Sequence, residues 1–374
     1  MTNEKLRFVD AGRSTFFATV KKRTDAYFRE NNLSRHANGA MWAKIAFFLT
    51  SYAVVYALLL SGWFSAWAML GLAVVMGCLY AFIGFNVCHD AIHGSLSANA
   101  KTNRIFSLIF NLIGANAYVW SITHNVVHHT YTNIPGHDED IDVAPGLIRL
   151  SPEEKMKGIY RFQHFYAFPL YGLASLSWVF RKDYKKFFQK RIGHYDNSNH
   201  PRKEYFNLFF FKGLYYTLFL VIPLLVMDIA WWQFVIGFLA MHLAGGLVLG
   251  LVFQLAHVVE GTEFPYPDEN NTIEEAWAVH QMRTTANFAC NSRIVNFLCG
   301  GLNFQVEHHL FPRICHIHYP ALSAIVRETA REHNVPYLEN PTFGGALQSH
   351  YRMLKKLGKE AWEETQPQSQ VAVA

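Results

Sequence analysis

Four apolar blocks, each long enough to cross a bilayer as a helix, constrain the fold of this chain more than any other feature. They cover about residues 41–60, 63–87, 206–227 and 231–256. A helix needs about 20 mainly apolar residues to span the hydrocarbon core of a membrane. Only Ser61 and Gly62 separate the first two blocks, and only residues 228–230 separate the last two. The blocks therefore predict two transmembrane hairpins.

The composition supports this interpretation. Hydrophobic residues make up 51% of the 374 residues and charged residues only 16%, whereas soluble domains carry about 25% charged residues. The composition excludes a disordered chain, a coiled coil and a disulfide-stapled miniprotein. The net charge of +5 is mild, so nucleic acid is not an expected partner. We predict an all-α integral membrane protein with a helical domain outside the bilayer.

Lysine and arginine predict the orientation of the hairpins. Neither hairpin connector contains these residues, whereas the first 40 residues and the stretch 181–203 are rich in them. Positive residues stay on the cytoplasmic side, which would place the N-terminus, residues 88–204 and residues 257–374 there. We expect three parts: a basic arm at 1–40, a membrane domain at 41–345, and a C-terminal helix with a disordered tail at 346–374.

Two weaker apolar stretches, residues 105–122 and 159–180, contain several polar side chains. Short segments of mixed polarity are typical of helices that lie at the membrane interface. We therefore expect two interfacial helices. A third hairpin of two further spans is the alternative.

Three clusters that contain histidines lie outside the apolar blocks. Residues four apart on a helix share a face, so each cluster can direct two or three imidazoles at one point. The members of the clusters are His89 and His93; His124, His128 and His129; and Gln305, His308 and His309.

This number of imidazoles indicates two metal ions. Imidazole suits iron, zinc, copper and nickel, but seven clustered histidines are too many for one zinc ion. The clusters contain no cysteine, which disfavours an iron–sulfur site. Two irons with open coordination positions can activate O2, which redox-inert zinc cannot. His257, which ends the fourth block, is the candidate for an eighth ligand, or else anchors the end of the helix.

These clusters resemble the histidine boxes of membrane-bound fatty acid desaturases. The third box within residues 300–312, with Gln305 in place of the first histidine, looks like the front-end and acyl-lipid branch, as does the stretch 281–287. The resemblance covers about residues 40–345. It implies that the iron ligands are His89, His93, His124, His128, His129, His308 and His309, and His257 matches the family's extra histidine after the last span.

The resemblance also implies roles for neighbouring polar residues. Gln305 would be a weak ligand or a hydrogen-bond partner of a ligand. Carboxylates commonly accept the free ring N–H of a metal-bound histidine, and the candidates here are Asp90, Asp138, Asp140 and Glu307. A solvated acidic loop is the alternative for residues 138–142. His316 and His318 follow the third box, but the resemblance does not make them ligands.

The sequence contains no His-Pro-Gly-Gly haem motif of the kind found in a fused cytochrome b5 domain. We therefore expect electrons to come from a separate ferredoxin or cytochrome b5 with its reductase. The basic stretch 181–203, with Lys355 and Lys356, could dock such an acidic donor. It could equally hold the anionic surface of the membrane.

The expected activity is O2-dependent desaturation, in which two iron ions and an external electron donor place a cis double bond in a fatty acyl chain. The chain could be carried by coenzyme A, a membrane lipid or a carrier protein. A membrane di-iron hydroxylase or ketolase is the nearest alternative. A histidine-rich metal transporter is less consistent with the sequence, because transport sites lie near the midplane of the bilayer. Here only His242 lies deep inside an apolar block, and we expect it to be a buried core residue.

Overall fold

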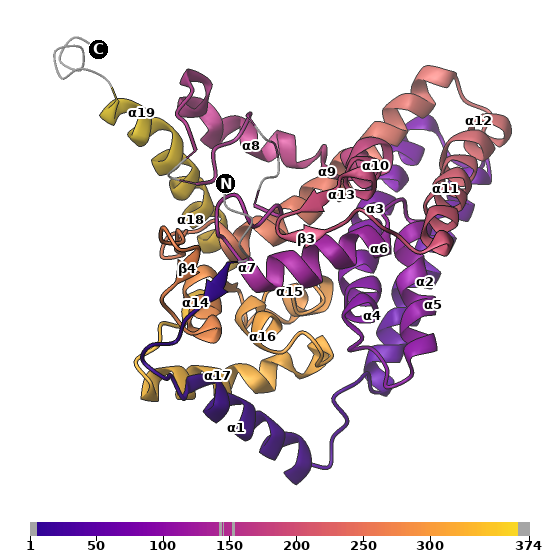
Figure 1. Ribbon diagram of the computed structural model, residues 1–374. Coiled ribbons are helices and arrows are strands. Elements are labelled where there is room, and N and C mark those ends of the chain that lie inside the picture. Colours follow the sequence, from indigo (N-terminus) through magenta and orange to yellow (C-terminus); the bar gives the residue numbers. More distant parts are fainter. Residues whose placement is uncertain (1–5, 142–143, 145, 152–153, 366–374) are drawn as a thin grey trace.

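The computed structural model describes residues 6–141, 144, 146–151 and 154–365, and helices dominate it (Figure 1). Four helices are long and apolar enough to cross a membrane. The prediction of an all-α membrane protein with four spans is thereby confirmed. The spans are α2 (Gly39–Leu60); α3 (Ala66–Ile83) continued by a π-helical turn (Gly84–Cys88) and α4 (His89–His93); α11 (Arg202–Tyr216) continued by a π-helical turn (Thr217–Val221) and α12 (Ile222–Val226); and α13 (Trp231–His257).

The second span begins and ends later than expected. It starts at Ala66 because the Ser65 hydroxyl accepts a hydrogen bond from the backbone N–H of Ala68, which caps the helix. It continues through the first histidine pair and ends at Gly94, whose φ of +74° is a left-handed conformation that favours glycine. The first histidine box is therefore the last turn of a membrane span.

Glycines bring the second and fourth spans into backbone contact. A Cβ atom at Gly77 of α3 would clash with the carbonyl oxygen of Met241 in α13. A Cβ atom at Gly245 would lie 2.7 Å from the carbonyl oxygen of Gly77. Small residues at a helix interface allow this approach in a bilayer, where close packing drives helix association. The contact fixes the last turn of α13 relative to α4.

The first weaker apolar stretch is bent rather than straight. Helix α5 (Ala100–Leu112) is followed by α6 (Ala117–Trp120), a π-helical segment (Ser121–His128) and α7 (His129–Tyr131), and the two halves meet at 110°. Gly114, with φ of +98°, and the Asn116 side chain, which caps α6, produce the turn. If the bent pair is counted as one broken span, the protein has up to five.

The second weaker stretch is divided into short helices that pack on α13. They are a 3-10 turn (Gly158–Phe162), α8 (Gln163–Tyr171), α9 (Ala174–Ser177), a π-helical turn (Trp178–Lys182) and α10 (Asp183–Phe188). A Cβ atom at Gly246 of α13 would clash with the carbonyl oxygen of Gly172. This close approach holds the junction of α8 and α9 against the fourth span.

The remaining helices form a layer beyond one end of the spans (Figure 1). Two short parallel strand pairs join distant segments, β1 with β4 and β5 with β6, whereas β2 and β3 form a local antiparallel hairpin. Part of the predicted basic arm is α1, which packs on α17 through buried Phe16, Val20 and Phe28.

The division of the chain into three parts stays a prediction, and residues 366–374 of the predicted tail lie outside the described residues. The elements are α1 (Phe16–Glu30), α14 (Trp277–Thr284), α15 (Arg293–Leu298), α16 (Gln305–Leu310), a 3-10 turn (His316–His318), α17 (Tyr319–Glu332), α18 (Phe343–Lys355), a π-helical turn (Lys356–Glu360), α19 (Ala361–Glu364), β1 (Arg7–Phe8), β2 (Arg191–Ile192), β3 (Tyr195–Asp196), β4 (Thr272–Ile273), β5 (Ala286–Phe288) and β6 (Leu338–Asn340).

Candidate metal centre

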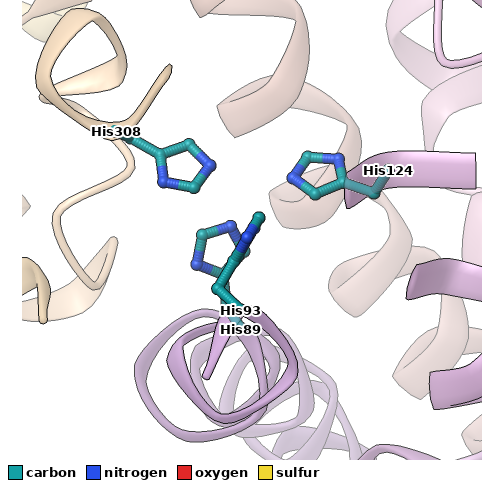
Figure 2. Close-up of side chains that lie close together, drawn as sticks. All are labelled: His89, His93, His124 and His308. Carbon is teal, nitrogen blue, oxygen red and sulfur yellow. The ribbon is translucent and has the colours of Figure 1, made fainter. Parts of the chain in front are cut away.

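The fold gathers the eight histidines that the sequence singles out. They come from α4, from the segment 124–129, from the last residue of α13 and from α16, and every one is buried. Figure 2 shows four of them: His89 and His93 project from one helix, and His124 and His308 approach them from separate elements. A metal ion held here would therefore tie the spans to the helical layer outside them.

The imidazoles form two separate groups, each able to hold a metal ion. The ligand atoms of His89, His93, His124 and His308 lie within 4.8 Å of one another, and so do those of His128, His257 and His309. His129 lies between the groups: its Nε2 atom is 3.2 Å from Nε2 of His124, and its ring is 4.5 Å from that of His309.

The groups do not follow the sequence clusters. His124 and His128 lie in the same π-helical segment with stacked rings 5.1 Å apart, yet they join different groups. His308 and His309 are likewise divided, because adjacent residues on α16 point in different directions. His89 and His93 thus join one group, whereas the histidines of the other two clusters are divided between groups.

Hydrogen bonds fix the tautomer of every imidazole in the second group. Nδ1 of His128 donates to Asp138 over 2.9 Å, Nδ1 of His309 donates to Gln281 over 2.7 Å, and Nδ1 of His257 donates to the Thr284 carbonyl over 3.2 Å. Each partner is an acceptor, so the proton is on Nδ1 and the Nε2 lone pair is available. Nε2 is the atom that this group would offer to a metal ion.

In the first group, two of the four rings are held in a similar way. Nδ1 of His124 lies 3.2 Å from a carboxylate oxygen of Asp140, and Nδ1 of His308 lies 3.2 Å from the hydroxyl of Tyr319. The ring of Trp120 also stacks on His124, with centroids 4.1 Å apart. These contacts limit the rotation of both imidazoles before any metal binds.

Unpaired nitrogen atoms show that the site fits a metal ion. Nε2 of His93, His257, His308 and His309 is buried and, in the described part of the chain, has no hydrogen-bond partner. Such orphaned polar atoms are costly in a folded protein unless a ligand satisfies them. Burial, followed by the repulsion of neighbouring imidazoles, holds the pKa of His308 and His309 well below the usual range. Both rings are therefore neutral, as ligands must be.

The two carboxylates after the second cluster, Asp138 and Asp140, contact imidazoles of the two groups. Asp138 accepts the N–H of His128 and also the backbone N–H groups of Asn133 and Asp140, each over 2.9 Å. Burial alone would raise the pKa of Asp138, but the His128 ring and these backbone donors hold it below its usual range. Asp140 pairs with His124 and lies 3.8 Å from Lys182.

Glu307 and Gln305 are placed differently from the other predicted partners. The Glu307 carboxylate accepts hydrogen bonds from Asn287 over 2.8 Å and from Tyr337 over 2.9 Å, so it anchors α16 to the neighbouring strand. Gln305 is buried at the start of α16. No hydrogen bond joins its side chain to the imidazoles among the described residues, and its role as a weak ligand stays a prediction.

Sequence reasoning missed several partners of the imidazoles. Gln281 and Tyr319 hold His309 and His308, and Thr132 donates to Gln281 over 2.9 Å. These side chains are uncharged and come from distant segments, so no spacing pattern points to them. Gln281 did fall within the stretch that resembles the acyl-lipid branch, which was the one available signal.

The histidines outside the two groups also have defined places. His242 is a buried core residue, as expected, and hydrogen-bonds to Ser175 and Tyr215. His350 is fully buried between the Tyr171 hydroxyl and the Val258 carbonyl. The cause is the packing of α18 against α8 and α13.

Two small cavities adjoin the first histidine group. An apolar one is lined by His89 together with aromatic and aliphatic side chains of α5, α6 and α13. A more polar one of about 80 Å³ shares Trp120, Trp178, Leu249 and Phe253 with it. Trp120 lines both cavities.

Four apolar helices with a buried polyhistidine centre at their ends define a class: a helical, membrane-type protein whose histidine clusters fit a histidine-box iron site. Comparison with known proteins gives the family. The sequence model of the fatty acid desaturases matches residues 65–341. The chain therefore belongs to the fatty acid desaturase family and is an oxidoreductase, as the resemblance of its histidine boxes indicated.

Several similar proteins are named as desaturases of lipid-bound acyl chains. The chain is 38% identical to an sn-1 linoleoyl-lipid 6-desaturase of Synechocystis sp., over 96% of this chain and 99% of that protein. It is 36% identical to the sn-1 linoleoyl-lipid 6-desaturase of Arthrospira platensis, over 95% of each chain. It is 35% identical to an acyl-lipid (8-3)-desaturase of Physcomitrium patens, over 94% of this chain and 74% of that protein.

Proposed function

We propose that this protein is an O2-dependent acyl-lipid desaturase that uses two iron ions to place a cis double bond in a fatty acyl chain. The observation that carries the proposal is the pair of buried imidazole groups beside an apolar cavity. Imidazole is a suitable ligand for iron, and the set lacks the thiolates that favour iron–sulfur clusters.

The ligand set follows from the two groups. His89, His93, His124 and His308 would hold one ion, and His128, His257 and His309 the other, with His129 between them. Two bound irons would supply the chemistry that reduces O2 to two waters, with two electrons and two protons from outside and two hydrogen atoms from the substrate. Asp138, Asp140, Gln281 and Tyr319 keep the imidazoles in the ligating orientation.

We infer that the acyl chain widens the apolar cavity beside His89, which has a volume of only about 10 Å³. Phe85, Phe110, Trp120 and Phe253 line it, and such walls exclude water while they hold a methylene chain by shape. A chain with no polar group near its reacting carbons can be aligned only by such packing. The protein's part in the reaction is thus to present two adjacent CH2 groups to the first histidine group.

The names of the relatives favour a lipid-bound substrate. Two of them, which the chain matches over nearly their whole length, are named for the linoleoyl group of a lipid and for position 6. We infer that this protein also acts on an acyl chain esterified to a lipid, and between an existing double bond and the carboxyl end. The substrate therefore arrives in the membrane rather than in water.

The electrons would come from a separate ferredoxin or cytochrome b5. Exposed Arg181, Lys185 and Lys190 form a basic surface that an acidic donor fits. The described connectors between paired spans contain no Lys or Arg, which supports a multi-pass orientation with the histidine centre on the cytoplasmic side.

The test is the fatty acid profile of an aerobic host that expresses the protein with a compatible electron donor, measured by gas chromatography–mass spectrometry. His308→Ala should abolish any new unsaturated species, because it removes a ligand from the first group. His333→Ala, the same change at the end of α17, should leave the profile intact. A hydroxylated product would instead indicate a di-iron hydroxylase, and bound iron without any oxidised lipid would contradict the proposal.

A further inference from the structure

The second cavity near the metal centre is polar on one side. It lies between the fourth span and the α9 segment, and its polar lining consists of Ser177, Lys182, Gln254 and Asp140. Its volume of about 80 Å³ suits a small polar group rather than a whole lipid head. Its apolar wall is shared with the cavity that His89 lines, so the two cavities are neighbours.

Gln254 is an unusual residue at this place. It lies in the last turns of an apolar span, is 3% exposed, and its Oε1 atom has no hydrogen-bond partner among the described residues. An unsatisfied buried polar group costs about 1–3 kcal/mol. A 180° rotation of the side-chain amide places its NH2 group where the Oε1 atom lies. Gln254 can therefore donate or accept a hydrogen bond in the cavity, and a ligand would satisfy it.

The polar cavity lies close to the ligands of the first group. Asp140, in its wall, is 3.2 Å from Nδ1 of His124, and Lys182 is paired with the same carboxylate at 3.8 Å. Trp120 lines both cavities and stacks on His124. Gln254 and His89 therefore line neighbouring cavities that have Trp120 as a common wall.

We propose that Gln254, with Ser177 and Lys182, binds the carbonyl group of the bond that joins the acyl chain to its carrier. A carbonyl oxygen accepts hydrogen bonds, and the cavity offers an amide, a hydroxyl and an ammonium group as donors. Because the carbonyl group is held in one place, the number of carbons between it and the metal centre is fixed. The same distance fixes which pair of carbons is desaturated. This inference rests on the proposed function and adds the element that sets the position of the double bond.

An analogue without the carbonyl tests this directly. The purified, iron-loaded protein with its electron donor is given a glycerolipid in which the same chain is linked either by an ester or by an ether. The wild type should prefer the ester by about 10-fold or more in kcat/KM, because the ether leaves the donors unpaired. Gln254→Leu should reduce that preference to within about 3-fold. Gln233→Leu, the same change at the other end of α13, should retain it.

Further variants and substrates keep the outcome decisive. If Gln254→Leu does not fold or bind iron, Ser177→Ala should show a smaller loss of the preference in the same direction. A second assay offers the same acyl chain as a coenzyme A thioester and so distinguishes a lipid ester from a thioester as the carbonyl that is bound. Gln254→Leu should lower kcat/KM only for the carrier that the enzyme uses. Equal use of ester and ether by the wild type, or an unchanged preference in both variants, overturns the inference. A wild type that forms no unsaturated product overturns the proposed function instead.

Discussion

The imidazole of His316 is hydrogen-bonded to the carboxylate of Asp90, with 3.0 Å between Nδ1 and Oδ2. Lys44 and His89 extend this contact on its two sides. Lys44 Nζ lies 3.2 Å from Nε2 of His316, and the other Asp90 oxygen lies 3.9 Å from Nδ1 of His89. With Cys315, Asp90 and His316 have the proximity of a third metal site. The ammonium group of Lys44 argues against a cation there, and the contacts form a polar chain that ends at the metal centre.

Lys44→Met tests whether this chain orients His89. Without the lysine, His316 loses one partner and the Asp90 carboxylate beside His89 is held less firmly. We expect about a 10-fold loss of affinity for one of the two irons, the order found when partners of metal ligands are removed. Mössbauer spectra of protein loaded with 57Fe should show the change in one of two iron signals. Lys101→Met, at an exposed position of α5, should leave both signals unchanged, and two unchanged signals in Lys44→Met would contradict the idea.

Asp138→Asn should affect the other iron. The carboxylate accepts the N–H of His128 and so keeps the Nε2 lone pair available, whereas an amide can donate to Nδ1 and stabilise the wrong tautomer. The expected loss of affinity is about 10–100-fold, measured as iron retained during dialysis against a chelator. Asp228→Asn, the same change in an exposed connector, is the control. Equal iron retention in both variants would exclude this role for Asp138.

Gly77→Ala should destabilise the protein through the contact between α3 and α13. The added Cβ would meet the carbonyl of Met241, which is backbone and cannot move aside. Overpacking of this kind costs roughly 1–3 kcal/mol, which thermal unfolding in one detergent would detect as a lower Tm. Gly71→Ala is a matched control in the same helix, because a Cβ there has no neighbour within 4 Å. A Tm that falls equally in both variants would exclude close helix packing as the cause.

The sequence predicted the parts of this molecule that repeat a pattern. Four spans follow from apolar length, and His89 with His93 follows from helical spacing. The division of His124 from His128 was not predictable, because the π-helical segment that carries them has no signature in the residues. Contacts such as Lys44 with His316, 272 residues apart, depend on tertiary packing alone. His257 was predicted only because it ends the fourth span, level with the other histidine clusters, and because it matches the family resemblance.

The buried Glu307 gives the stability of the metal-free protein a dependence on pH. Burial raises its pKa to about 7, against the hydrogen bonds from Asn287 and Tyr337, while the ordinary value is 4.5. The folded state therefore binds more protons than the unfolded state between these values, and stability falls as pH rises through that window. Glu307→Gln keeps the shape without the charge, so it should gain up to about 3 kcal/mol relative to wild type between pH 4.5 and pH 8. Unfolding of the two proteins across this range, after iron removal, would measure the difference, and parallel stability curves would show that Glu307 is not the titrating group.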